Sequence, residues 1–325
     1  MSSPEFYNQS TEKVYNRHKQ FEKTPKRKMT VKVYRMLRRL ISGLLHNIFT
    51  PPNVLMVPMT ILIILHSGNI HKSYRMSRVR KLKLGFKMFL NTHRIPTGSS
   101  YRAHLAMALK ILETPPDVPG DIAEFGTWKG GATANLSLVC RIVGRRLMVY
   151  DSFEGLPEPK LGERIAQASA KGAYRGSLEE VKSNIKRYGA IECCEFVKGW
   201  FEDTLPKLNS PLLLAYLDVD FESSLHTCIK YIWPNLVDRG YVFIDESMLL
   251  DYIALFYSEK WWRKYFNRTP PGLIGAGTGL PLGQFYIGPW PALGWYVHQF
   301  EDPSSVSYTQ KTMSGYWSYY PDDDT

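Results

Sequence analysis

The stretch DIAEFGTWKGGATANL, residues 121–136, decides how the chain is interpreted. DIAEF is typical of a short strand, a glycine turn follows it, and GATANLSLVCRIV, residues 131–143, has a helical pattern. Glycine-rich turns between a strand and a helix commonly hold a phosphate. Here Glu124 stands near the end of the strand, where its carboxylate would repel a phosphate. We therefore expect a ligand that carries no phosphate at this turn.

Downstream of this unit, strand-like runs alternate with helical runs. The strand-like runs are RRLMVYD (145–151), CEFVKG (194–199), LLLAYLDVD (212–220) and YVFIDE (241–246), with GQFYIGP (283–289) and GWYVHQF (294–300) as a closing pair. A helical pattern covers 223–236, and we expect Asp238, Arg239 and Gly240 to form the turn after it. The order predicts an α/β fold: a mostly parallel sheet with right-handed crossovers and helices on both faces.

Acidic residues or glycines stand at the carboxyl end of each strand in the predicted parallel sheet. They are Glu124, Gly126, Asp151, Gly199, Asp218, Asp220, Asp245 and Glu246. In open α/β sheets, ligands bind beyond the carboxyl ends of the strands. These residues therefore predict one pocket at that edge of the sheet.

An acidic pocket of this kind suits S-adenosylmethionine, which has a sulfonium, an ammonium group and a ribose but no phosphate. Gly126 would let the backbone approach the ligand, and Asp151 would accept hydrogen bonds from the two ribose hydroxyls. Gly199, Trp200 and Phe201 would flank the adenine.

The predicted cofactor-binding residues each have a structural alternative. They are Glu124, Gly126, Thr127, Trp128, Asp151, Ser152, Gly199, Trp200 and Asp218. Glu124 could instead cap the next helix, Asp151 could close a turn, and Trp200 could belong to the core. Taken together, the residues favour the cofactor.

Four stretches of the sequence resemble the macrocin O-methyltransferase family. They are VPGDIAEFGTWKGGAT, YDSFEGLPEP, KGWFEDTLP and LAYLDVDFESSLHTCIKYIWPNLVDRGYVFIDE, between about residues 118 and 246. The resemblance implies the class I methyltransferase (Rossmann-like) fold, methyl transfer from S-adenosylmethionine to a hydroxyl group, usually of a sugar, and a homodimer. It also implies a divalent metal, typically Mg²⁺.

The resemblance further implies which residues hold that metal. Asp218 in LDVD, and Asp245 with Glu246 in IDES, match the family's metal-binding acids, and Asp218 and Asp245 are also the expected catalytic residues. Glu246 stands where the family usually has a second aspartate. Related catechol methyltransferases have a lysine base at the position that Phe221 occupies here.

The acceptor of the substrate proton is left open by the sequence. Asp220, Glu222 and His226 are candidates, although Asp220 could cap the following helix and His226 could be structural. Trp261, Trp262, Tyr265 and Phe266 suit stacking on a sugar, and the glycines between 272 and 283 suit a loop near the ligand; packing in the core is the alternative.

Charge divides the chain into a basic arm and an acidic body. Residues 1–100 contain 19 Lys and Arg against 3 Asp and Glu, a net charge of +16, whereas the remaining 225 residues contain 22 against 27, a net charge of −5. We expect residues 1–29 to be disordered, 30–99 to form a basic helical and amphipathic extension, 100–300 to form the methyltransferase domain, and 301–325 to form a tail. The four cysteines lack metal-ligand spacing and indicate a reduced compartment.

Two interpretations of the extension stay open. A basic amphipathic helix near 30–49, followed by the uncharged run 54–65, could lie on an anionic membrane surface, together with the basic residues up to 90. Alternatively, the extension packs on the protein. The uncharged run has 12 residues and contains Pro58, too short for a spanning helix. We expect a cytoplasmic protein, at the inner face of the membrane if the first interpretation holds.

Three functions compete at this point. The first is a Mg²⁺- and S-adenosylmethionine-dependent O-methyltransferase acting on a small-molecule or glycan acceptor, including a glycosylated or lipid-linked metabolite. The second is a non-catalytic or cofactor-binding membrane or scaffold protein on the same fold. The third, methylation of nucleic acid, rests on basic charge alone, and we do not expect a nucleic-acid partner because no reader motif is present.

Overall fold

The computed structural model describes residue 65 and residues 69–160, 171–245, 250–272, 275–276 and 294–297. Several predicted features lie outside these ranges. They are the helix expected near 30–49, nearly all of the run 54–65, the strand expected at 283–289, the tail 301–325, and the proposed metal ligand Glu246.

The described strands form one sheet in the order β3-β2-β1-β4-β5-β7-β6. Its members are β1 (Asp121–Phe125), β2 (Leu147–Asp151), β3 (Cys194–Lys198), β4 (Leu212–Leu217), β5 (Leu236–Ile244), β6 (Gly275–Ala276) and β7 (Gly294–Val297). Strands β1 to β5 pair in parallel, whereas β7 runs antiparallel to β5 and β6. The expected mostly parallel sheet is confirmed, and the strand order reverses between β1 and β4, where ligands bind in such sheets.

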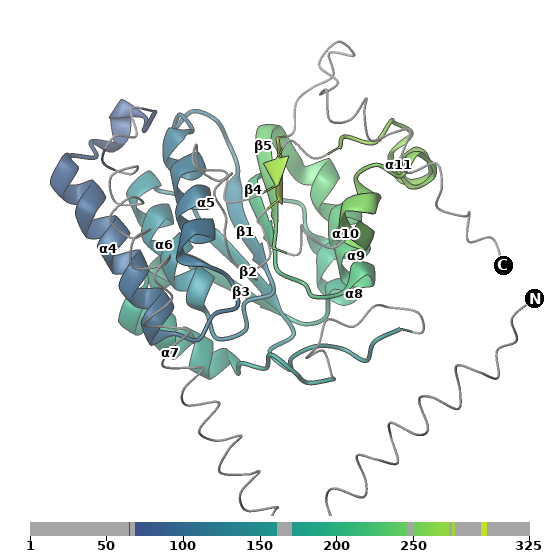
Figure 1. The fold of residues 1–325 in the computed structure, drawn as a ribbon, viewed down its shortest axis with the longest axis horizontal. Helices are drawn as coiled ribbons and strands as arrows, with labels where there is room; N and C mark the ends of the chain where they lie inside the picture. Colours follow the sequence, from purple (N-terminus) through teal and green to yellow (C-terminus); the bar gives the residue numbers. More distant parts are fainter. Residues whose placement is uncertain are drawn as a thin grey trace, which may run out of the picture. The chain divides into compact units, whose positions relative to one another are not determined.

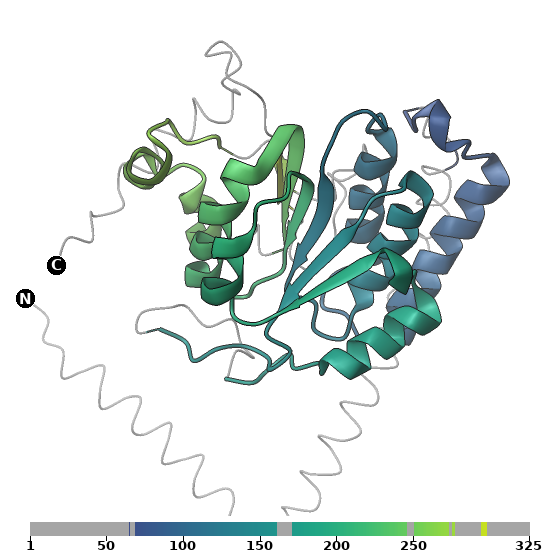
Figure 2. The same ribbon diagram turned by 180° about the vertical axis from the view of Figure 1, so that it is seen from behind.

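Helices cover both faces of this sheet (Figures 1 and 2). They are α4 (Arg78–Arg94), α5 (Tyr101–Glu113), α6 (Gly131–Val143), α7 (Leu178–Tyr188), α8 (Phe201–Thr204), α9 (Glu222–Ile232), α10 (Leu250–Leu255) and α11 (Glu259–Phe266), with short 3-10 turns η1 (Lys72–Tyr74), η2 (Ile191–Cys193), η3 (Leu205–Lys207) and η4 (Trp233–Asn235). Helices α4 to α7 lie on one side of the sheet and α8 to α11 on the other.

Two hydrophobic cores result from the alternation of side chains along the strands. In β4, Leu214 and Tyr216 face the core under α4, α5 and α6, while Ala215 and Leu217 face the core under α9 to α11. All four are completely buried. The continuous apolar run of β4 is therefore explained by a central strand that is covered on both faces.

The turn predicted at Asp238, Arg239 and Gly240 is wrong, because these residues lie inside β5. Leu236 pairs with Leu212 and Tyr241 pairs with Leu214, so β5 uses more residues than β4 over this interval. The turn-forming residues are thus accommodated as an irregularity within the strand and do not separate a helix from it.

Helix α4 packs on the body through its buried residues Leu84 and Met88, which belong to the core shared with α5 and α6. Residues 78–94 of the basic extension therefore pack on the protein, as one of the two alternatives predicts. None of the helices in the described ranges is long and apolar enough to cross a membrane.

A buried polar network joins α4, α5 and α6 to the segment that follows α4. The Nδ2 of Asn135 donates to Nδ1 of His104 (2.9 Å), so Nε2 of His104 carries the proton that is shared with Oγ of Ser99 (2.6 Å). Asn91 Nδ2 donates to Oδ1 of Asn135 (3.0 Å). Burial lowers the pKa of His104 to about 3, which keeps it neutral. The network fixes the loop at 95–100.

Strands β1 and β4 meet most closely at Gly126, just beyond β1. Its N–H donates to the carbonyl of Tyr150 (2.9 Å), and Asp218 N–H donates to the carbonyl of Phe125 (2.9 Å). A Cβ on Gly126 would lie 1.9 Å from the carbonyl oxygen of Asp218, and its φ is +85°. The expectation that Gly126 makes room for a ligand is therefore incomplete: the space that its missing side chain leaves is filled by the Asp218 backbone.

We predict that Gly126→Ala destabilises the protein by about 2 kcal/mol or more, because it combines a left-handed backbone with a collision against main-chain atoms. Thermal unfolding followed by circular dichroism measures this. Gly98→Ala is the control, since nothing lies within 4 Å of a Cβ built at Gly98. Equal melting temperatures for the two variants would contradict the assignment.

Candidate functional site

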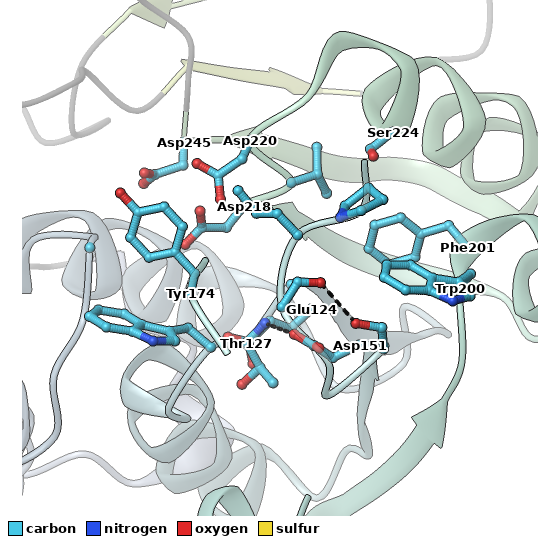
Figure 3. A pocket seen from close by; sticks show the side chains of 18 of the residues that line it. Glu124, Thr127, Asp151, Tyr174, Trp200, Phe201, Asp218, Asp220, Ser224 and Asp245 are labelled. Carbon is cyan, nitrogen blue, oxygen red and sulfur yellow. Dashed lines mark hydrogen bonds between the residues drawn. The ribbon is translucent and has the colours of Figure 1, made fainter. Parts of the chain in front are cut away.

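A cavity of about 670 Å³ opens at the carboxyl ends of the parallel strands. It is lined by ten of the eleven residues predicted to bind cofactor or metal: Glu124, Gly126, Thr127, Trp128, Asp151, Ser152, Gly199, Trp200, Asp218 and Asp245. The eleventh, Glu246, lies outside the described residues. Figure 3 shows acids at two places in this cavity, Glu124 with Asp151 and Asp218 with Asp220 and Asp245.

Glu124 is almost completely buried in β1, with 1% of its surface exposed. Burial raises the pKa of its carboxyl to about 8, although a hydrogen bond from Thr133 acts in the opposite direction. Its Oε2 atom has no hydrogen-bond partner among the described residues. Helix α6 begins after Gly130 without a side-chain cap, so Glu124 does not cap it. A buried carboxyl facing a cavity with an unused oxygen is suited to a cationic or hydrogen-donating ligand.

Asp151, at the end of β2, is fixed by the main chain. Its Oδ2 accepts from the N–H of Thr127 (2.7 Å) and its Oδ1 from the N–H of Phe153 (2.6 Å). Burial raises its pKa, while these backbone donors lower it. Each carboxylate oxygen can accept a second hydrogen bond. The carboxylate is therefore held in one orientation and retains capacity for two hydroxyl donors.

Trp200 and Phe201 line the cavity on another side (Figure 3). Trp200 precedes α8 and is half-buried, and Phe201 lies edge-on to Phe125 with ring centroids 6.3 Å apart. The alternative that Trp200 belongs to the core does not hold. The indole is available to a flat ligand.

A second group of acids surrounds the hydroxyl of Tyr216. This hydroxyl lies 3.0 Å from Oδ1 of Asp245 and 3.2 Å from Oδ2 of Asp218, and can donate its proton to one of them. Asp220, whose φ is +57°, lines the same part of the cavity. Burial raises the pKa of Asp220 and of Asp245 to about 6 each.

The acids around Tyr216 belong to the residue type that Mg²⁺ prefers as a ligand. In the described ranges, no group of three or more His, Cys, Asp or Glu side chains is placed to hold a metal ion. Mg²⁺, however, is commonly held by one or two carboxylates, with water and substrate oxygens completing its shell. Asp218 and Asp245, both open to the cavity, fit that requirement.

Two of the three candidate proton acceptors lie elsewhere. His226 Nε2 is 3.5 Å from Oε1 of Glu222, one turn earlier on α9, and neither residue lines the cavity. Burial lowers the pKa of His226 to about 4. Asp220 does line the cavity, and it stands one residue before Phe221, the N-cap residue of α9.

The aromatic residues predicted to stack on a sugar do not contact this cavity. Trp262 is completely buried and donates from Nε1 to the carbonyl of Leu255 (2.7 Å). Trp261 and Phe266 pack against it on α11, whereas Tyr265 packs on Trp261 and is 39% exposed. The prediction is wrong because Trp261, Trp262 and Phe266 serve the core under α9 to α11 and Tyr265 lies outside the cavity.

Tyr174 is a cavity residue that the sequence analysis missed. Its ring meets that of Trp128 edge-on, with centroids 5.4 Å apart, and it lies beside the acids around Tyr216 (Figure 3). Burial raises its pKa, and the charges of Asp220 and Asp218 add to this. No motif marks Tyr174, because it stands in an irregular segment between β2 and α7. Only the three-dimensional structure brings it to the acids.

We predict that the free energy of unfolding falls as the pH rises, because the buried carboxyl of Glu124 must lose its proton. Its folded-state pKa of about 8 exceeds its ordinary value of 4.5, so the native state holds the proton more tightly and loses stability as pH rises between these values. Between pH 5 and pH 8 the loss should be about 3 kcal/mol. Urea unfolding of wild type and Glu124→Gln measures it.

The pH dependence should be clearly smaller in Glu124→Gln. Glu202→Gln, which changes an exposed carboxylate on α8, is the control and should keep the wild-type slope. If the free energy of unfolding depended on pH equally in wild type and in Glu124→Gln, Glu124 would already be ionised at pH 5.

Comparison with known proteins connects this cavity to one family. Residues 95–267, more than half of the chain, match the family model described as Macrocin-O-methyltransferase (TylF). The chain is 35% identical over 163 residues to the 8-demethyl-8-(2,3-dimethoxy-alpha-L-rhamnosyl)-tetracenomycin-C 4'-O-methyltransferase of Streptomyces olivaceus, a match covering 44% of this chain and 62% of the relative. It is 32% identical over 168 residues to the demethyldecarbamoylnovobiocin O-methyltransferase of Streptomyces niveus, covering 45% and 63%. The matches thus span less than two thirds of these relatives.

Among solved structures, the O-methyltransferase NovP has a TM-score of 0.49 at 19% identity, covering 76% of this chain and 99% of NovP. The calicheamicin methyltransferase CalS11 has a TM-score of 0.44 at 15% identity, covering 78% and 94%. The family model spans β1 to β5 with every described cavity residue, so the chain belongs to the macrocin O-methyltransferase family.

Proposed function

We propose that the chain is an S-adenosylmethionine-dependent O-methyltransferase that acts on a hydroxyl group of a sugar or of a glycosylated small molecule. One observation carries the proposal: a single cavity contains the buried carboxyl of Glu124, the oriented carboxylate of Asp151, and the acids around Tyr216. The first two suit the cofactor and the last suit an acceptor hydroxyl. Membership of the family supports this division.

The cofactor would lie between β1 and β2. Asp151 would accept the ribose hydroxyls, because its two oxygens are already aligned by Thr127 and Phe153. Glu124 lies beneath the turn after β1, where its unused Oε2 would accept a donor from the cofactor. Trp200 and Phe201 provide apolar surface for the adenine.

Asp218 and Asp245 would hold Mg²⁺, with Glu246 as a further predicted ligand. The ion, when bound, lowers the pKa of the acceptor hydroxyl and orients it toward the methyl group. The Tyr216 hydroxyl lies between the two carboxylates and can orient one of them by donating its proton. Neutral Asp245 would bind a cation poorly, so binding should strengthen as pH rises above about 6.

Asp220 is the best placed of the three candidate proton acceptors. It alone of them lines the cavity, and burial raises its pKa to about 6, which makes it a stronger base while it stays ionised at neutral pH. A hydroxyl oxygen bound beside Asp218 would then pass its proton to Asp220.

The acceptor would enter between Tyr174 and the acids. The Trp128–Tyr174 pair gives this side of the cavity an aromatic surface of the kind that packs against the apolar faces of sugar rings. The name of the Streptomyces olivaceus relative specifies a rhamnosyl compound, and that of the Streptomyces niveus relative specifies a derivative of novobiocin. We therefore propose a glycosylated acceptor for this chain. Its assembly as a homodimer and its location in the cytoplasm remain predictions.

We predict that Asp220→Asn lowers kcat at least 100-fold, as expected for loss of a general base. Formation of S-adenosylhomocysteine is measured with Mg²⁺ and a panel of rhamnosides, including the acceptor that the name of the Streptomyces olivaceus relative specifies. Glu222→Gln is the matched control, because Glu222 stands two residues away but outside the cavity, and it should retain activity.

The same assay separates the competing functions. Asp245→Asn should abolish turnover and its dependence on Mg²⁺ while leaving cofactor binding in place. Cofactor binding without methyl transfer to any acceptor would instead favour a non-catalytic protein on this fold. Full activity of Asp220→Asn would remove Asp220 from the mechanism.

A further inference from the structure

Helix α4 carries an exposed apolar stripe on the side opposite its packing face. Val79 is 59% exposed, Leu82 38% and Phe86 55%. They are three of the five large hydrophobic side chains that are exposed within the described residues. Their spacing of three and four residues places them on one side of the helix. The buried Leu84 and Met88 face the other way, toward α5 and α6.

Basic side chains flank this stripe. Arg78, Arg80 and Lys83 are exposed, and the helix contains further Lys and Arg residues but no acid. No Asp or Glu occurs anywhere between Glu22 and Glu113 in the sequence. The outer surface of α4 is therefore apolar along its centre and positively charged beside it.

A shallow hollow of about 370 Å³ adjoins the start of α4. It is lined by Ile70, His71, Lys72, Arg75, Met76, Ser77 and Lys81. Four of these seven side chains are basic or can become so, and none is acidic. The hollow extends the basic surface beyond the helix and has room for an anionic group.

Like charge argues against two possible occupants of this surface. A second copy that docked through the same helix would bring the two basic borders together. The predicted helix near 30–49 of this chain also contains only basic charges. Exposed apolar side chains bordered by Lys and Arg instead match the two components of an anionic lipid surface, its acyl boundary and its headgroups.

We propose that α4 docks the protein on an anionic lipid surface, with Val79, Leu82 and Phe86 entering the headgroup boundary and Arg78, Arg80 and Lys83 contacting lipid phosphates. The anionic lipid surface is thereby assigned as the contact of one part of the amphipathic extension that the sequence predicts. This inference does not depend on the proposed enzyme activity.

Vesicle sedimentation of the full chain tests the proposal. Vesicles of phosphatidylcholine alone are compared with vesicles in which about 30% of the lipid is phosphatidylglycerol. Each comparison is made at low and at high salt. Wild type should bind the anionic vesicles, and this binding should weaken as the salt concentration rises. Val79→Ser/Leu82→Ser/Phe86→Ser and, separately, Arg78→Gln/Arg80→Gln/Lys83→Gln should each lower partitioning at least tenfold.

Matched controls remove the same kinds of group elsewhere. Lys186→Gln/Lys198→Gln/Lys207→Gln deletes three exposed lysines from the body, and Tyr265→Ser deletes the exposed aromatic of α11. Both should bind like wild type. Circular dichroism melting verifies that all variants fold, which is expected because the changed side chains lie on the surface.

Four results would overturn the proposal. One is no binding of wild type to anionic vesicles. Another is unchanged binding by both α4 variants, which would place the contact in residues 1–68. The third is a wild-type dimer, seen by light scattering, that the Val79→Ser/Leu82→Ser/Phe86→Ser variant converts to a monomer without any vesicle binding. Salt-sensitive RNA binding that only the charge variant loses, with no binding to vesicles, would likewise replace lipid by nucleic acid.

Discussion

The structure depends on the close approach of the ends of β1 and β4. Gly126 lies against the backbone of Asp218. The N–H of Asp218 donates to the carbonyl of Phe125 on β1, and the N–H of Gly126 donates to the carbonyl of Tyr150 on β2. Because the two strands are neighbours at the point where the sheet order reverses, this contact sets the distance between the turn after β1 and the acids after β4. Any side chain at 126 would separate the two halves of the cavity.

Burial of several carboxyl groups is the second feature of the site. Glu124, Asp220 and Asp245 all have raised pKa values, chiefly because they are buried where water cannot solvate a carboxylate. A folded protein tolerates such a cluster when a function requires it. A cationic cofactor and a divalent ion both relieve the cost, so the same electrostatic argument supports both halves of the proposed reaction.

The mostly parallel sheet and most of the cavity could be predicted from the sequence because they follow local patterns. Each of the first five strands ends at an acid or a glycine, and parallel strands bring those ends to one edge. Tyr174 could not be predicted, since its position depends on how an irregular segment folds over Trp128. Trp262 was assigned to the ligand because an aromatic cluster looks the same in sequence whether it serves a core or a site. The prediction of a turn at 238–240 was wrong because the pairs that Leu236 and Tyr241 make with β4 hold the residues between them in the strand as an irregularity.

The most direct test of the central claim is calorimetric titration of S-adenosylhomocysteine into the full chain and into Asp151→Ala. The account predicts micromolar binding by wild type, and a loss of at least tenfold in Asp151→Ala, because two hydrogen bonds to a charged acceptor disappear. Glu202→Gln, an acid on the rim of the same cavity, should bind like wild type. Absence of binding to wild type, or equal binding to Asp151→Ala, would contradict the assignment of this cavity to the cofactor.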